Sequence, residues 1–143
     1  ARGNTAAAIA AMADGLEYFS SAYPAGTTQL FARACFGDAE AKSQALARID
    51  AHLATRPSHI SGVSAYFLIH AGEPARALAL LQDRPTTNDG LVMGELFGAP
   101  LAEVRRLPEF AEFLRRFGLA SYWDEVGPPD QCHKDARGDY ICE

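Results

Sequence analysis

Residues 65–81 read AYFLIHAGEPARALALL, and the helical hairpin that they predict sets the fold class expected for the whole chain. Apolar residues recur at helical spacings of three and four on both sides of Gly72 and Pro74. Glycine is favoured just beyond the end of a helix, and proline is favoured in the first turn of the next one. The stretch therefore predicts two helices joined by a tight turn.

The same pattern occurs once before this stretch. A helix predicted over 27–36 stops at Gly37, Asp38 caps a second helix over 39–55, and Pro57 closes the pair. The separation of Gly37 from Gly72 is close to the ~34-residue period of tetratricopeptide repeats. In the second unit, small and large residues stand where that repeat has them, at Ala65, Leu68, Gly72, Ala77 and Leu81. Two successive units predict stacked antiparallel helical hairpins.

The remaining segments also have helical spacing, and no segment shows the alternation of a strand. A helix is expected over 6–23, capped by Asn4 or Thr5, and further helices over 88–97, 101–106, 108–117 and 120–126. We therefore predict an all-α chain and one domain over 1–143. Its parts are an N-terminal helix (1–26), a first hairpin (27–57), a second hairpin (58–85), C-terminal helices that cap the stack (86–127) and a tail (128–143).

The C-terminal third carries a family resemblance. Its motifs are RLPEF at 106–110, FLRRFGL at 113–119, YW at 122–123 and GPPDQC at 127–132. In this order they resemble the end of bacterial tetratricopeptide-repeat regions that follow winged-helix DNA-binding domains or adenylate-cyclase-type signalling domains. The resemblance implies an interaction or sensor module of a larger bacterial protein that acts in signalling or transcription regulation.

Composition excludes several functions for this stretch of chain. The net charge is −5 and no segment is rich in lysine or arginine, so direct nucleic-acid binding is not expected. The uncharged run over 57–72 is shorter than the ~18 apolar residues of a membrane span. The chain starts at Ala1 without the features of a signal peptide, and we expect it to be a piece of a larger protein.

The cysteines give a hint about the compartment. Cys132 and Cys142 lie close together in a polar tail, where a disulfide would constrain the unfolded chain by roughly 2–3 kcal/mol. Such a bond favours a periplasmic or other extracytoplasmic location, whereas two free thiols would fit the cytoplasm. With the bond closed, we expect Tyr140 and Ile141 to pack on Trp123 and Phe117.

A few residues could form a catalytic or metal site, but each has a simpler structural explanation. Cys35 beside a histidine could be a nucleophile, but a cysteine on the apolar side of a helix is more often a core residue. Cys132, His133 and Cys142, together with His59 or His70, could bind zinc, but their spacing is unlike that of structural zinc sites. We expect no catalytic residue, no metal and no cofactor, and therefore no enzyme.

The expected binding residues are aromatic. Phe31, Tyr66 and His70 occupy positions that face the concave groove in tetratricopeptide repeats, although core packing is the competing interpretation. The expected occupant is a protein, a peptide or a small ligand. The alternative is a homodimer scaffold that uses the alanine-rich first helix. Four arginines are expected on a solvated face, namely Arg105, Arg106, Arg115 and Arg116.

Overall fold

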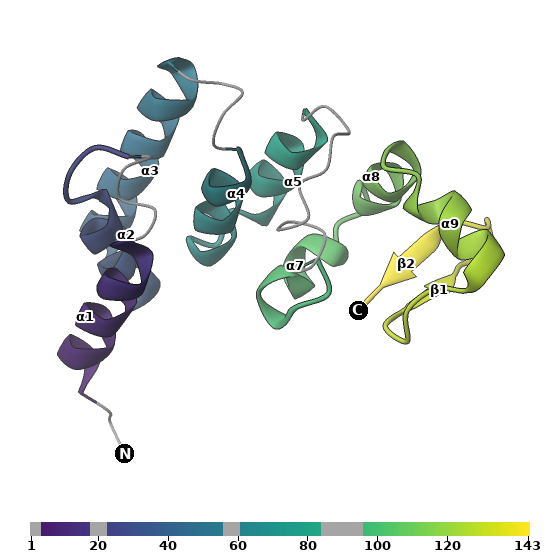
Figure 1. The fold of residues 1–143 in the computed structure, drawn as a ribbon, viewed down its shortest axis with the longest axis horizontal. Helices are drawn as coiled ribbons and strands as arrows, with labels where there is room; N and C mark the ends of the chain where they lie inside the picture. Colours follow the sequence, from purple (N-terminus) through teal and green to yellow (C-terminus); the bar gives the residue numbers. More distant parts are fainter. Residues whose placement is uncertain (1–3, 18–22, 56–60, 84–95) are drawn as a thin grey trace. The chain divides into compact units, whose positions relative to one another are not determined.

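A computed structural model describes residues 4–17, 23–55, 61–83 and 96–143 of this protein. Helices form most of its regular structure. Figure 1 shows these helices along the chain and a small two-stranded sheet near the C-terminus. The predicted all-helical character is confirmed apart from that sheet. The chain divides into two units, 1–71 and 72–143. The boundary falls within the hairpin predicted over 58–85, so the single domain stays a prediction.

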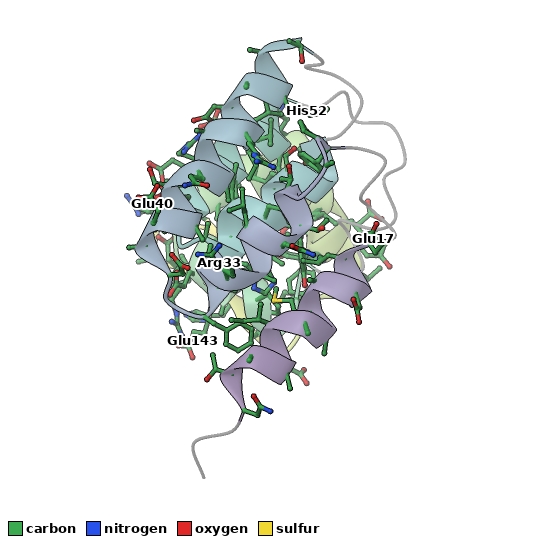
Figure 2. The ribbon with its side chains drawn as sticks, turned by 90° about the vertical axis from the view of Figure 1, so that its left-hand side faces the viewer. Glu17, Arg33, Glu40, His52 and Glu143 are labelled. Carbon is green, nitrogen blue, oxygen red and sulfur yellow. A yellow bond between two sulfur atoms is a disulfide. The ribbon has the colours of Figure 1, made fainter. Side chains whose placement is uncertain are left out.

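The first unit contains four described helices: α1 (Thr5–Leu16), α2 (Thr27–Cys35), α3 (Ala39–Thr55) and α4 (Ser61–His70). Asn4 caps α1, because its side-chain oxygen accepts a hydrogen bond from the amide of Ala7 at 3.3 Å. Asp38 caps α3 in the same way by accepting from the amide of Ala41 at 2.9 Å. Figure 2 shows Glu40 near the start of α3 and His52 near its end. Both predicted caps are confirmed.

The two glycines that set the repeat spacing end helices, as the sequence predicts. Gly37 follows α2 with a φ angle of 91°, and Gly72 follows α4 with a φ angle of 75°. Side chains with a Cβ atom rarely adopt this left-handed conformation, so glycine allows the chain to turn sharply there. Pro74 then occupies the first turn of α5 (Pro74–Gln82). Ser58, Pro57 and Pro85, the other predicted boundaries, lie outside the described residues.

Aromatic side chains fill the core of the first unit. The rings of Phe31 and Phe67 stack with centroids 4.0 Å apart, and Tyr23 lies 5.1 Å from Phe67. Ile49 of α3 has no exposed surface. The two ring contacts join the loop before α2 to α2 and α4.

The second unit begins with α5 and continues with a 3-10 turn, η2 (Ala99–Leu101), and the helices α7 (Ala102–Arg105), α8 (Phe110–Arg116) and α9 (Leu119–Val126). These agree with the helices predicted over 101–106, 108–117 and 120–126 to within a few residues. The prediction over 88–97 falls mostly outside the described residues. Phe110, Phe113 and Phe117 stack in sequence along α8, with centroid separations of 5.6 and 4.5 Å.

The tail is a β-hairpin, so the prediction that every regular element is helical is wrong here. Strands β1 (Cys132–Lys134) and β2 (Tyr140–Cys142) pair antiparallel, with Cys132 opposite Cys142. In the turn, the Asp135 side chain accepts hydrogen bonds from the amides of Arg137 and Asp139, and Gly138 has a φ angle of 85°. The two strands are too short to show an alternating pattern in the sequence.

Candidate functional site

The structure brings the three predicted groove residues together in one aromatic cluster of the first unit. The rings of Tyr66 and His70, one turn apart on α4, have centroids 4.4 Å apart. Phe31 of α2 meets the His70 ring edge-on at 6.5 Å. Phe31 itself has no exposed surface, whereas Tyr66 and His70 are half-buried. Phe31 therefore belongs to the core beneath the pair, and the groove role of Tyr66 and His70 stays a prediction.

A buried hydroxyl pair next to this cluster was not predicted. The Tyr23 hydroxyl lies 2.5 Å from the Ser64 hydroxyl, and both side chains are buried. Burial raises the pKa of Tyr23 to about 12, against a smaller lowering effect of the bond to Ser64. The His52 ring lies 4.9 Å from the Tyr23 ring. No sequence signal joins residues so far apart in the chain, because their pairing depends on how the helices pack.

Cys35 of α2 lies next to the end of α4 in the first unit. Its sulfur lies 3.9 Å from the main-chain oxygen of His70, to which the thiol donates a weak hydrogen bond. Burial raises the pKa of the Cys35 thiol, which disfavours the nucleophilic thiolate. The side chain is half-buried and not bonded to another cysteine. In this arrangement the thiol faces a carbonyl oxygen. A nucleophilic cysteine would need an imidazole base in that position.

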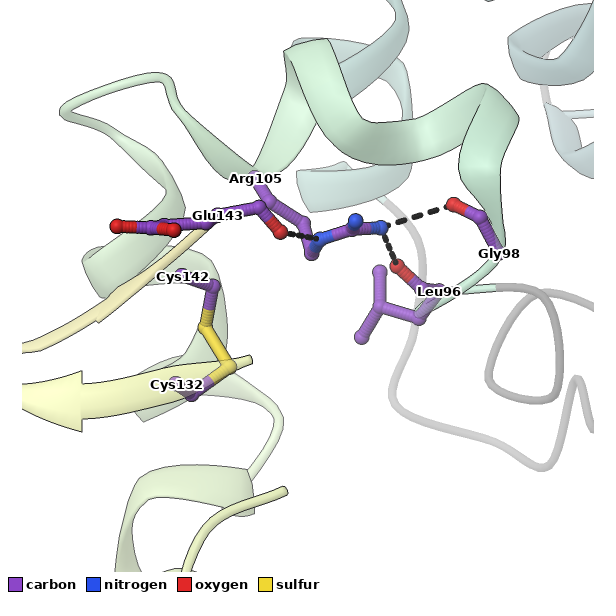
Figure 3. The surroundings of a disulfide bond; sticks show 6 residues. All are labelled: Leu96, Gly98, Arg105, Cys132, Cys142 and Glu143. Carbon is purple, nitrogen blue, oxygen red and sulfur yellow. Dashed lines mark hydrogen bonds between the residues drawn. A yellow bond between two sulfur atoms is a disulfide. The ribbon is translucent and has the colours of Figure 1, made fainter. Parts of the chain in front are cut away.

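Arg105 is buried, so its prediction as part of a solvated face is wrong. Arg105 is 5% exposed, and its guanidinium group donates to three main-chain oxygens, as Figure 3 shows. The Nε atom bonds to Glu143 at 3.0 Å, and the Nη1 atom bonds to Leu96 at 3.0 Å and to Gly98 at 2.9 Å. Arg106, Arg115 and Arg116 are exposed as predicted. The Arg105 side chain therefore joins the C-terminal residue of the hairpin to the 96–98 segment.

Burial also acts on the charge of this arginine. It lowers the pKa of Arg105, and the neighbouring charge of Arg106 lowers it further. The three carbonyl dipoles oppose this effect by stabilising the cation through hydrogen bonds. A sequence alone could not distinguish Arg105 from Arg106, because adjacent positions of a short helix differ only in which one faces the core.

The predicted disulfide is present. Cys132 and Cys142 are joined by a bond, and both residues are buried (Figure 3). The bonded sulfurs are not thiolates, so the zinc site considered for these cysteines has lost two of its ligands. Among the residues that the structure describes, no group of three or more His, Cys, Asp or Glu side chains is arranged to hold a metal ion.

The hairpin lies against α9 through an aromatic contact and a polar one. The Tyr140 ring meets the Trp123 ring edge-on at 5.1 Å, which confirms the predicted packing of Tyr140. The Tyr140 hydroxyl donates to Asp124 at 2.9 Å, and the Lys134 ammonium lies 2.6 Å from the same carboxylate. Ile141 is 44% exposed, so the prediction that it also seals apolar surface is wrong. Its side chain alternates with those of Tyr140 and Cys142 and points to the outer face of the hairpin.

Comparisons of this chain with protein-family models, with curated proteins and with solved structures found no match. Within the described ranges of the chain, no helix is both long and apolar enough to cross a membrane. The side chains themselves are therefore the basis for assigning a function.

Proposed function

We propose that this chain is a recognition module without catalytic turnover, and that it binds a protein, a peptide or a small ligand through the Tyr66 and His70 side chains of α4. The observation that carries the proposal is the ring pair itself, with its centroids 4.4 Å apart and both residues half-buried. An aromatic ring beside an imidazole offers an apolar face together with groups that form hydrogen bonds. Such pairs suit ligands that combine apolar and polar groups.

The core beneath the pair supports this role. Phe31 and Phe67 stack at 4.0 Å, and Phe31 meets the His70 ring edge-on. A ring that is fixed by packing loses little conformational freedom when a ligand binds, which favours affinity. The placement of Cys35 against a carbonyl oxygen agrees with a non-catalytic role for the neighbouring thiol.

In the same proposal, the module is a tetratricopeptide-type stack within a larger bacterial regulatory protein. Two observations support this. Gly37 and Gly72 both end helices, and their separation is close to the ~34-residue repeat period. The C-terminal motifs resemble such regions. The disulfide is compatible with a periplasmic or other extracytoplasmic location, because oxidising compartments maintain such bonds.

A screen with labelled protein tests the binding role. Amide spectra of ¹⁵N-labelled protein are recorded against a library of short peptides and small polar aromatic molecules. We expect a binding compound to shift the amide signals of Tyr66 and His70, and the Tyr66→Ala/His70→Ala double variant to lose the effect. Tyr122→Ala is the matched control, since Tyr122 is 58% exposed and lies in the second unit. Compounds that bind the double variant as tightly as the original chain would contradict the proposal.

Self-association is the second candidate function. The observation that favours it is a set of exposed alanines on α1, namely Ala6, Ala7, Ala8, Ala10 and Ala11. Small side chains allow two helices to approach closely. Sedimentation equilibrium over a wide concentration range tests this candidate, with Ala7→Glu as the disrupting variant. A monomer at every concentration would remove it.

A further inference from the structure

The surface attachments of the hairpin of residues 131–143 are weak. Two ion pairs join it to the helices, Lys134 with Asp124 and Arg115 with Asp139, and their side chains are between 38% and 54% exposed. Exposed ion pairs of this kind typically contribute only about 0–1 kcal/mol each. The ladder has three residue pairs, and an isolated two-stranded hairpin is marginal in water. The hairpin therefore depends on its buried contacts, which are the Tyr140 ring and the bond from Arg105 to Glu143, and on the disulfide.

The disulfide lies at the open end of this ladder. Cys132 and Cys142 form the last of the three pairs, farthest from the turn. Beyond them, Gln131 and Glu143 are exposed and joined by a hydrogen bond from the Glu143 amide to the Gln131 oxygen at 3.0 Å. Local opening is easiest at such an end, so fraying there would bring the two sulfurs into contact with solvent although both cysteines are buried in the closed form.

The same end of the hairpin holds the buried arginine. Glu143 follows Cys142 directly and supplies one of the three oxygens that bind the Arg105 guanidinium. Tyr140, two residues before Cys142, packs on Trp123, which is 5% exposed. Trp123 also contacts the ring of Phe97 at 5.8 Å. Displacement of β2 would therefore remove an acceptor from a buried cation and expose an aromatic surface on α9.

We propose that the Cys132–Cys142 bond makes the hairpin a redox-dependent cover of the Trp123 side chain: closed when the bond is oxidised, and released from α9 when it is reduced. The reductant is a dithiol. Its first thiolate attacks one sulfur and forms a mixed disulfide, and its second thiolate then resolves that intermediate. The S–S bond of the protein breaks and takes up two electrons and two protons, while the dithiol becomes a cyclic or paired disulfide.

The effect of reduction follows from the contacts above. Without the bond, the ends of the tail regain the conformational freedom that ring closure had removed. The turn of 135–139 is polar, so it has no apolar burial that could hold the tail in place of the bond. The helices keep aromatic contacts that do not involve the hairpin, namely Phe113 of α8 with Phe117 at 4.5 Å and Trp123 of α9 with Phe97 at 5.8 Å. Reduction should therefore release the hairpin and leave the helices folded.

Dithiothreitol is the dithiol used in the test, and two signals report on the hairpin. The amides of Glu143 and Asp135 form hydrogen bonds across the hairpin, at 3.0 and 2.8 Å, and their exchange with solvent should become at least about tenfold faster on reduction. Trp123 is the single tryptophan of the chain, so its emission maximum should shift to longer wavelength as the ring meets water. Far-ultraviolet circular dichroism should keep its helical signal.

Two variants serve as controls. Cys132→Ser/Cys142→Ser should show the released state without any reductant and should not respond to it. Cys35→Ser keeps the bond and should respond to dithiothreitol as the original chain does. If the reduced protein keeps slow amide exchange and an unshifted emission maximum, non-covalent contacts are enough to hold the hairpin and the proposal is overturned. Loss of the helical signal on reduction would also overturn it, because the bond would then brace the whole unit.

Discussion

The two units of the chain are both helical, but they bury different kinds of polar group. The first unit buries a neutral pair, the hydroxyls of Tyr23 and Ser64, which satisfy each other at 2.5 Å. The second unit buries a cation, the Arg105 guanidinium, which needs oxygens from Leu96, Gly98 and Glu143. Burying a charge requires more compensation than burying a hydroxyl. The second unit therefore brings the 96–98 segment and the last residue of the hairpin, Glu143, to the Arg105 side chain.

Replacing Phe67 with alanine should produce the largest change, and it acts on the first unit. Phe67 has no exposed surface and packs on both Phe31 and Tyr23. Removing a fully buried phenylalanine ring lowers the free energy of unfolding by about 3–5 kcal/mol. Urea unfolding followed by circular dichroism measures the loss. Phe36→Ala is the control, since Phe36 is 45% exposed. A loss below about 1 kcal/mol for Phe67→Ala would mean that the aromatic stack does not organise this unit.

Arg105→Met tests the cation on which the second unit depends. The variant keeps most of the side-chain volume but leaves three main-chain oxygens without their charged donor. We expect a loss of about 2–4 kcal/mol, because the Leu96 oxygen is buried and the other two are partly buried, and leaving them without a donor outweighs the relief of the buried charge. Arg105→Lys should restore little, since an ammonium group cannot reproduce the planar arrangement of donors. Arg106→Met is the control, because Arg106 is the exposed neighbour. Equal losses of unfolding free energy for the two variants would contradict the role of Arg105 as the buried donor.

The helices could be predicted from the sequence because their signals are local. Asn4 and Asp38 are caps, and Gly37 and Gly72 end helices, and each of these needs only its immediate neighbours in the chain. The disulfide was also predictable, since two cysteines in a short polar tail restrict the choice of partner. Local signals therefore place most of the regular structure.

The features that the sequence did not reveal depend on contacts between distant residues. Tyr23 meets Ser64, and Arg105 meets Glu143, only after the helices have packed. Tyr140 and Ile141 are adjacent and both large, yet the pleat of β2 turns Ile141 outward and Tyr140 toward Trp123. The hairpin itself had a signal, the residues DARGD at 135–139, which suit a short turn with a left-handed glycine.

An alkaline titration contrasts the neutral pair of the first unit with the rest of the chain. Burial raises the pKa of Tyr23 in the folded protein to about 12, from the usual 10.0 of a tyrosine. Because the folded state holds this proton more tightly, its contribution is complete below about pH 10 and is lost as the pH rises toward about 12. The full shift corresponds to at most about 2–3 kcal/mol.

Unfolding free energies measured across this range should fall with pH, and Tyr23→Phe should flatten most of the slope. Burial also raises the pKa of Tyr140, as does its bond to Asp124, so Tyr140→Phe should remove a smaller part. An unchanged slope in Tyr23→Phe would show that the hydroxyl is not buried in solution.

Acid should act on the hairpin of the second unit, with the smallest effect of the four. Hydrogen bonding to Lys134 and to Tyr140 lowers the pKa of Asp124, and main-chain hydrogen bonding from the amide of Asp139 lowers that of Asp135. For a carboxyl group with a lowered pKa, the stabilisation is present above the unfolded value of 3.8 and is lost as the pH falls through the folded value. Amide spectra recorded from about pH 6 to about pH 2.5 should therefore show the signals of 131–143 moving before those of α4, which contains no carboxylate. Asp124→Asn should loosen the contact with Lys134 at neutral pH and weaken this acid response, whereas Asp130→Asn, at an exposed position just before the hairpin, should preserve it. Simultaneous movement of hairpin and helix signals would mean that these carboxylates do not hold the hairpin separately, and that acid acts on the whole fold at once.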